Sequence, residues 1–350
     1  MKQILITPTI AAMAQEYADT LFADKKGKFI PPLVGLRNLI LDLKELNRDL
    51  ADCDKYVKYV EEIIKDYATL KNLQPSKVKE YKDRYDAILN ETKLCATIKR
   101  RKRNLPKEEK DRKGLKEYNV AFYDEIVCRM HYEEVRPYLG KYMKRIGFNT
   151  CVYCNNAKAT FSQQLEEAYY PFDHSKPKDK YPFLCISFFN LYPCCTSCNG
   201  HKLNNADKSF QIYVEQEPMS DPFVFGIERK YVKEGDPKSV KVEFCARREE
   251  DKLLAKDYNE SYRIKEFYNS EDEKRSSYKM LKDIDKYRAS YPKATEASLK
   301  LKVDRKYLFQ EVLGVDDDEN NIFTDVNKKL KIDTAKDANL LYLKSATYRV

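Results

Sequence analysis

Long apolar segments are missing from this sequence of 350 residues. It has no run of 18 apolar residues, the length that marks a membrane-spanning helix, so we expect no membrane span. The first residues hold only a short apolar stretch and soon reach acidic ones, so a signal peptide is not expected either. Tryptophan is absent, and histidine occurs only three times. The hydrophobic content of 42% supports one large core or about two to three smaller domains.

Cysteine, in contrast, is plentiful, with ten residues. Four of them form two Cys-x-x-Cys pairs, Cys151 with Cys154 and Cys195 with Cys198. Without an export signal, metal binding explains such pairs better than disulfides do, and we expect a reducing, cytoplasmic location. Because two intervening residues let both thiolates of a pair reach one metal ion, the pairs predict a structural zinc site with four cysteine ligands. Cys194 is an alternative ligand, although its spacing to Cys198 is less suitable. The competing interpretation is that the four cysteines are buried without any relation to one another.

Positive charge is concentrated in one segment of the chain. Residues 93–116 contain eleven Lys or Arg and three Asp or Glu, so they hold nearly all of the net charge of +9. Neutralising phosphates releases counterions, which makes such a block suited to nucleic acid. A solvated linker between helices is the competing interpretation. The candidate nucleic-acid contacts in this block are Lys99, Arg100, Arg101, Lys102 and Arg103.

Helical periodicity dominates the first part of the chain. Apolar residues recur three and four positions apart through 33–70, again over 78–89 with room to continue into the basic block, and again over about 118–146. These stretches predict an N-terminal helical domain over residues 1–147.

The amino-acid composition changes at residue 148. Cysteines, aromatics and prolines are dense through about residue 215, and this stretch, 148–215, is the expected second domain. Beyond it, the strings DPFVFGI and SVKVEFCA have β character, and residues 252–312 return to a charged, Tyr-rich helical pattern. We therefore expect a third region over 216–350 of mixed, mostly helical structure, and an α+β, mainly helical fold for the whole chain.

A set of polar residues lies between and just after the two cysteine pairs. In chain order the set consists of Asp173, His174, Asn190, Asn199, His201 and Lys202. An Asp-His dipeptide is weak evidence by itself, since a lone surface histidine is usually unremarkable. A neutral imidazole, however, takes a proton from water near neutral pH, so His174 is a candidate general base. The carboxylate of Asp173 is a hard oxygen ligand of the kind that Mg²⁺ prefers.

The order CxxC, DH, NL, CxxCN and K resembles the HNH endonuclease family. The segment DHSKPKDKYPFLCISFFNLYPCCTSCNGHK is also similar to HNH proteins of prokaryotic anti-phage systems, of the Septu and retron-associated types. The strong resemblance covers about residues 148–205, and a looser one reaches the string AKDYNESYRIKEFYN. It implies a ββα-metal core: one strand ends at Asp173-His174, a second covers Asn190–Pro193, and a helix starts near Thr196.

The resemblance also implies roles for the polar residues. Asp173 and Asn199 would bind a catalytic Mg²⁺ or Mn²⁺ ion, and Asn190 would brace the loop that carries His174 and orient its ring. Lys202 would contact the phosphate. The zinc ion on the four cysteines would hold the frame together without a catalytic role.

Two positions depart from the family pattern. His201 stands where relatives have a basic or variable residue, and a further metal ligand, a phosphate contact and a bystander are all open for it. Ser175 follows the histidine where relatives more often have an aromatic or aliphatic residue, which alters the packing under the base.

The function expected from the sequence is a metal-dependent HNH endonuclease that hydrolyses DNA, acting as the effector of a prokaryotic anti-phage system. From the same resemblance we also expect a protein partner, and the candidate partner is an ATPase of the same defence system. Two alternatives stay open. One is a zinc-stabilised nucleic-acid-binding module without catalysis, and the other is a toxin-like nuclease that cleaves RNA or tRNA.

Overall fold

The computed structural model of the chain describes residues 1–25, 29–101, 116–202, 210–216, 221–290, 306–316 and 318–338. Within these ranges helices make up most of the ordered structure, and the strands form five two-stranded sheets. The α+β, mainly helical fold class expected from the sequence is therefore confirmed. No helix in these ranges is both long enough and apolar enough to cross a membrane.

The N-terminal helices are α1 (Pro8–Thr20), α2 (Pro32–Leu46), α3 (Cys53–Leu70), α4 (Val78–Ile88) and α5 (Glu91–Leu94). Helices α2, α3 and α4 follow the apolar stripes of the sequence, whereas the sequence did not predict α1 and α5. Helix α1 begins with a proline in its first turn, and the side chain of Thr7 caps it by accepting from the backbone N–H of Ile10. The leucine stripe of α2 is fully buried and packs on α3, as an amphipathic helix requires.

The basic segment differs from the helical expectation. Where the structure describes it, at residues 93–101 and 116, its main element is strand β2 (Thr97–Arg101), which pairs antiparallel with β3 (Glu117–Ala121) directly after the segment. Along β2 the buried side chains of Ile98 and Arg100 alternate with the exposed ones of Thr97 and Lys99, which is the alternation of a strand. The prediction of a helix that continues into the block is therefore wrong. The run of charged residues conceals the alternation of buried and exposed side chains that is typical of a strand.

The helix expected over about 118–146 is also divided. Strand β3 takes its first residues, and the remainder forms α6 (Phe122–Arg129) and α7 (Val135–Ile146). The break lies at His131, whose positive φ of 57° places it in the left-handed region and ends the first helix.

The central part of the chain has little regular structure. Its elements are β4 (Phe161–Ser162), β5 (Glu167–Ala168), β6 (Phe172–His174), β7 (Leu191–Pro193), α8 (Thr196–Lys202) and β8 (Tyr213–Val214). Strands β6 and β7 pair antiparallel, and α8 follows β7 after two residues. Strand β1 (Ile4–Leu5) pairs parallel with β8, so the beginning of the chain is bound to its centre.

The C-terminal part is mixed, as the sequence predicts. Strands β9 (Phe223–Ile227) and β10 (Val242–Ala246) pair antiparallel and coincide with the two strings of β character. The helices that surround this hairpin are α9 (Lys252–Tyr262), α10 (Ile264–Tyr268), α11 (Glu271–Ser290) and α13 (Lys328–Asp337). Helix α13 packs on β9.

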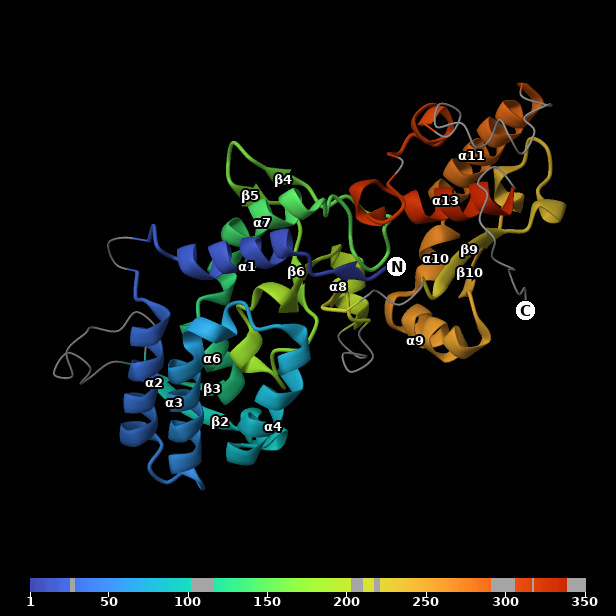
Figure 1. Cartoon of the computed structure of the whole chain (residues 1–350). Coiled ribbons are helices and arrows are strands. Elements are labelled where there is room, and N and C mark those ends of the chain that lie inside the picture. Colours follow the sequence, from blue (N-terminus) through green and yellow to red (C-terminus); the bar gives the residue numbers. More distant parts are fainter. Residues whose placement is uncertain are drawn as a thin grey trace.

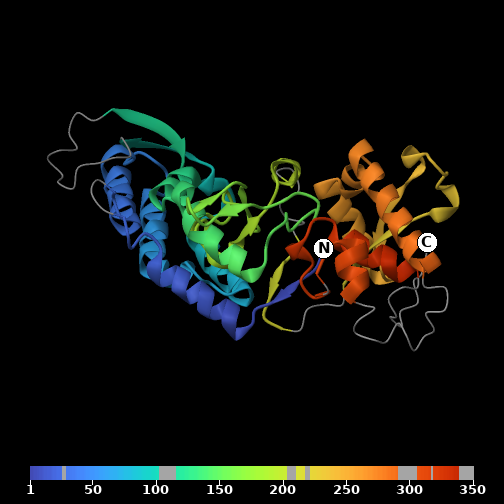
Figure 2. The same ribbon diagram turned by 90° about the horizontal axis from the view of Figure 1, so that it is seen from above.

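Helices α1, α2, α3, α4, α6 and α7 gather on one side of the molecule, and α9, α10, α11 and α13 gather with β9 and β10 on the other (Figure 1). Seen from above, the two groups lie side by side along the longer dimension, with the N-terminus between them (Figure 2). One cluster of buried apolar side chains includes residues from both groups and from the centre. The proposed boundaries after residues 147 and 215 therefore stay a prediction, with a continuous core across both.

Candidate active site and metal centre

The two cysteine pairs meet in one cluster. The sulfur atoms of Cys151, Cys154, Cys195 and Cys198 all lie within 4.8 Å of one another. In a tetrahedral zinc–thiolate site with Zn–S bonds of about 2.3 Å, the sulfurs are about 3.8 Å apart, so the four residues fit this ion. Cys194 is not in the cluster, because its thiol donates to the backbone carbonyl of Pro171 at 3.6 Å. The four predicted cysteines therefore form a cluster that could bind a metal ion such as zinc, and Cys194 lies outside it.

The backbone around both pairs is shaped to support thiolates. The N–H of Asn156 points at the sulfur of Cys154, and the N–H of Cys198 points at the sulfur of Cys195, both at 3.4 Å. Asn155 has a positive φ of 54°, which turns the chain tightly after the first pair. Burial raises the pKa of Cys151, so a bound cation is what would stabilise its thiolate.

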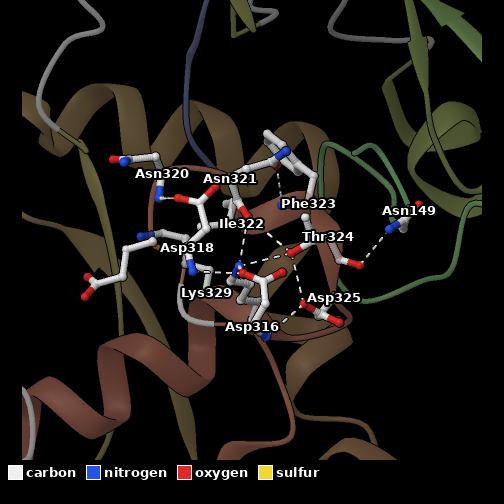
Figure 3. A network of polar contacts seen from close by, with 12 residues as sticks. Asn149, Asp316, Asp318, Asn320, Asn321, Ile322, Phe323, Thr324, Asp325 and Lys329 are labelled. Atoms are coloured by element: carbon white, nitrogen blue, oxygen red, sulfur yellow. Dashed lines mark hydrogen bonds and ion pairs between the residues drawn. The ribbon is translucent and has the colours of Figure 1, made fainter. Parts of the chain in front are cut away.

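The first cysteine pair also anchors the C-terminal part of the chain. The carboxamide of Asn155 donates to the carbonyls of Ile322 and Asp325, and its oxygen accepts from the N–H of Lys329. Asn149 binds the carbonyl of Thr324 in the same loop (Figure 3).

Two buried tyrosines make the same connection from α9 and α10. Tyr258 donates to the carbonyl of Tyr153 at 2.7 Å, and Tyr268 donates to the carbonyl of Cys154 at 2.8 Å. The cysteine cluster is thus a joint between the centre of the chain and its C-terminal helices.

Strand pairing brings the Asp-His dipeptide beside the second cysteine pair. Asp173 lies opposite Tyr192 and His174 opposite Leu191 in the β6–β7 register. Strand β7 then leads directly to Cys195 and α8. The strands and the helix lie where the sequence analysis expected them, with the second strand beginning at Leu191.

His174 is buried and held in one orientation. Its Nε2 lies 3.1 Å from the carbonyl of Cys185, and a carbonyl only accepts, so Nε2 carries the proton in this bond. Nδ1 is then the basic nitrogen, and it has no hydrogen-bond partner among the described residues. The ring packs against Tyr132 with centroids 4.4 Å apart. Burial lowers the pKa of His174 to about 3, and the charges of Lys202 and Lys178 add to this, so the imidazole is neutral.

Asp173 binds two donors through one carboxylate oxygen. Oδ2 accepts from the ammonium of Lys202 at 2.5 Å and from the hydroxyl of Tyr153. Oδ1 accepts no hydrogen bond from the part of the chain that the structure describes. The side chain of Lys202 is 3% exposed and binds the carboxylate of Asp173. In this conformation it does not extend toward a phosphate, which is the role that the resemblance implied.

Asn190 holds the loop after His174. Its Oδ1 accepts from the N–H of Lys176 at 2.7 Å, and its Nδ2 donates to the carbonyls of Lys176 and Leu184. Leu184 precedes Cys185, whose carbonyl orients the His174 ring. Asn190 thus acts on the ring through the backbone and does not touch it.

Asn199 and His201 lie on different faces of α8. Asn199 precedes Lys202 by three residues, so both side chains lie on the face that Lys202 turns toward β6. No described residue forms a hydrogen bond with the carboxamide of Asn199. His201 packs beside Phe267 of α10, with ring centroids 6.4 Å apart. A hard cation such as Mg²⁺ would therefore find one open carboxylate oxygen and one open carboxamide, and these donors fit it.

The basic residues of β2 are mostly engaged within the protein. Arg100 pairs with Glu125 at 3.1 Å, and Arg101 pairs with Glu45. Lys99 is exposed. Two further predicted contacts, Lys102 and Arg103, lie outside the described residues. Of the three described candidates, Lys99 is the one whose side chain faces solvent.

Sequence reasoning missed three residues that shape this site. Tyr153 stands inside the first cysteine pair and binds Asp173, so its position was a signal that could have been used. Tyr132 and Cys185 contact His174 from distant or irregular segments, and no local pattern marks them.

Comparison with known proteins gives one informative likeness. Over 89 residues the chain is 33% identical to the Septu protein PtuB of Bacillus thuringiensis. This region is 25% of the chain and 30% of that relative, so the likeness covers less than a third of either protein. No protein-family description matches the chain, and no solved structure matches it. The Septu part of the expected resemblance is therefore found.

Proposed function

We propose that this protein is a metal-dependent HNH endonuclease. The observation that carries the proposal is the arrangement of β6, β7 and α8: β6 carries Asp173 and His174, β7 leads into the second cysteine pair, and α8, which carries Asn199, is tied to Asp173 by Lys202. A neutral histidine with a free Nδ1, an open carboxylate oxygen and an open carboxamide are what hydrolysis of a phosphodiester requires from a protein. A nucleic-acid-binding module without catalysis has no need of them.

Each residue then has a definite task. His174 accepts the proton of the attacking water at Nδ1, while the bond from Nε2 to Cys185 fixes the ring. Asp173 and Asn199 would hold the Mg²⁺ or Mn²⁺ ion, which supplies a positive charge against the phosphate oxygens when it is bound. Asn190 keeps the loop under the base in place. The structural zinc on the four cysteines would keep β7 and α8 aligned with the first cysteine pair.

The proposed substrate is DNA, and the proposed role is that of an effector in anti-phage defence. The likeness to a Septu protein supports the defence role. The basic strand β2, in the middle of which Lys99 is exposed, supports contact with a phosphate backbone. We further propose a protein partner, an ATPase of the same system, that controls cleavage. Cleavage by the chain alone that addition of the ATPase leaves unchanged would argue against this partner.

The test is nicking of supercoiled plasmid by the full chain in Mg²⁺, with and without EDTA. Wild type should nick, EDTA should stop it, and His174→Ala should lower the rate by at least about a hundredfold. His131→Asn is the matched control, because it replaces another histidine and keeps a residue that tolerates the positive φ. Full activity in His174→Ala would overturn the assignment. Binding without nicking in wild type would favour the non-catalytic module, and cleavage of RNA alone would favour a ribonuclease.

A further inference from the structure

A buried ammonium group occupies an oxygen-lined position at the candidate site. The Nζ atom of Lys202 lies 2.5 Å from Oδ2 of Asp173, 2.5 Å from the carbonyl of His174 and 3.5 Å from the carbonyl of Ser175. All three oxygens belong to β6 and the residue after it, whereas Lys202 comes from the end of α8.

Such an arrangement follows from the cost of buried charge. An isolated carboxylate or ammonium is expensive to remove from water, and each needs a partner of opposite sign. Asp173 and Lys202 supply this partner to each other, since both are buried. Tyr153 donates to the same oxygen, and the Lys202 ammonium lies 5.7 Å from its ring. In the protein without a divalent cation, the ammonium of Lys202 therefore supplies the positive charge that balances the carboxylate of Asp173.

A divalent cation on the same carboxylate changes this balance. Two positive charges about 4 Å apart in a partly buried site repel strongly enough to change a binding constant by more than about tenfold. The ion and the ammonium would therefore compete for Asp173.

Building on the proposed function, we propose that Lys202 is an internal competitor of the catalytic metal. Its ammonium neutralises Asp173 in the metal-free protein, is displaced when the ion binds, and so sets the metal affinity of the site. Lys202 is thus a residue that determines metal affinity and acts through Asp173.

The experiment measures Mn²⁺ binding to the zinc-loaded full chain by electron paramagnetic resonance. Lys202→Gln keeps a hydrogen-bond donor and removes the charge, so it should bind Mn²⁺ at least about tenfold more tightly than wild type. Lys202→Arg keeps the charge and should stay near the wild-type affinity.

A matched control variant is available in the C-terminal part. Lys329 is equally buried and forms ion pairs with Asp221 at 2.5 Å and Asp333 at 3.2 Å. Lys329→Gln should therefore leave Mn²⁺ binding unchanged. Asp173→Asn should remove the measured Mn²⁺ site in every background.

A second measurement uses the wild-type protein alone, so that it does not depend on how the variants fold. Acetylation of Lys202, followed by mass spectrometry, should be slow without Mn²⁺ and several-fold faster with it. Lys329 should show no such change.

The outcomes separate the two proposals. Unchanged or weaker Mn²⁺ binding in Lys202→Gln, or no rise in Lys202 acetylation, would overturn the competition while leaving an Asp173-dependent metal site in place. Absence of any Mn²⁺ binding that depends on Asp173 would instead remove the proposed function and the competition with it.

Discussion

Two buried lysines of this protein lie in oxygen-lined positions that look alike and differ in their surroundings. Lys202 binds Asp173 and two carbonyls of the β6 end. Lys328 binds the carboxylate of Asp316, the carbonyl of Asn321 at 3.1 Å and the hydroxyl of Thr324 at 3.0 Å, and its side chain is fully buried. In both, a buried ammonium is the cation among the oxygen atoms.

The loop around Lys328 is closed by its own hydrogen bonds. Asp316 accepts from the N–H of Asp318, Asp318 accepts from the N–H of Asn320, and Asp325 accepts from the N–H of Asp316 and the hydroxyl of Thr324 (Figure 3). The same loop is bound to the first cysteine pair. Its oxygens therefore serve to fasten the C-terminal part of the chain.

The position around Lys202 is left open on one side. Asp173 keeps one oxygen without a partner among the described residues, and its neighbour His174 keeps a free Nδ1. The comparison teaches that a buried lysine among oxygens does not define a reactive site. What distinguishes the Lys202 position is a carboxylate oxygen of Asp173 and a ring nitrogen of His174 that lack a partner among the described residues.

The largest effect is expected from the cysteine cluster, because both lysine positions depend on it. Cys154→Ser should remove the zinc and lower the free energy of unfolding by about 5 kcal/mol or more, since binding a structural zinc is coupled to folding. Zinc content by mass spectrometry and denaturant unfolding check this. Cys194→Ser is the control: it lies outside the cluster and keeps a donor for Pro171, so it should retain zinc.

Loss of the Lys328 charge should have the next largest effect. Lys328→Met removes three hydrogen bonds from a fully buried side chain and leaves the carboxylate of Asp316 without its ammonium partner, so we expect a loss of about 3 kcal/mol. Thermal unfolding with and without Mn²⁺ would measure it. Mn²⁺ should not restore the stability of Lys328→Met, whereas it should raise the stability of Lys202→Gln. If Mn²⁺ stabilised both variants, the two lysine positions would not differ in metal binding.

Local sequence patterns predicted the parts of these regions that are formed by neighbouring residues. Two Cys-x-x-Cys spacings predicted the four-cysteine cluster, and the motif order placed both strands and the start of α8. The pairing of Lys202 with Asp173 spans 29 residues, and that of Asn155 with Ile322 spans 167. Such contacts follow from tertiary packing, which a single sequence does not display. Strand β2 was missed for another reason. Both its buried and its exposed positions include charged residues, so the sequence shows no alternation of apolar and polar residues.

A smaller effect is expected from the histidine beside the open position. His174 has a pKa of about 3 in the folded protein, below its usual 6.5, mainly because it is buried. The unfolded chain therefore binds the additional proton first, so the stabilising contribution is complete above pH 6.5 and is lost as the pH falls toward 3. Between pH 6.5 and 5 this amounts to about 2 kcal/mol. Denaturant midpoints across this range should fall more steeply in wild type than in His174→Ala, and equal slopes would contradict a buried neutral ring.

The smallest effect concerns a lysine that is exposed, in contrast to Lys202 and Lys328. Lys99 lies on β2 with its side chain in solvent, so it is free to contact a phosphate. Lys99→Ala should weaken DNA binding a few-fold and reduce the slope of log affinity against log salt by about 1, without changing cleavage of bound DNA. Lys256→Ala, which removes a lysine whose side chain is 72% exposed on α9, is the matched control and should leave the salt slope unchanged. Equal slopes in wild type and Lys99→Ala would place the phosphate contacts elsewhere on the protein.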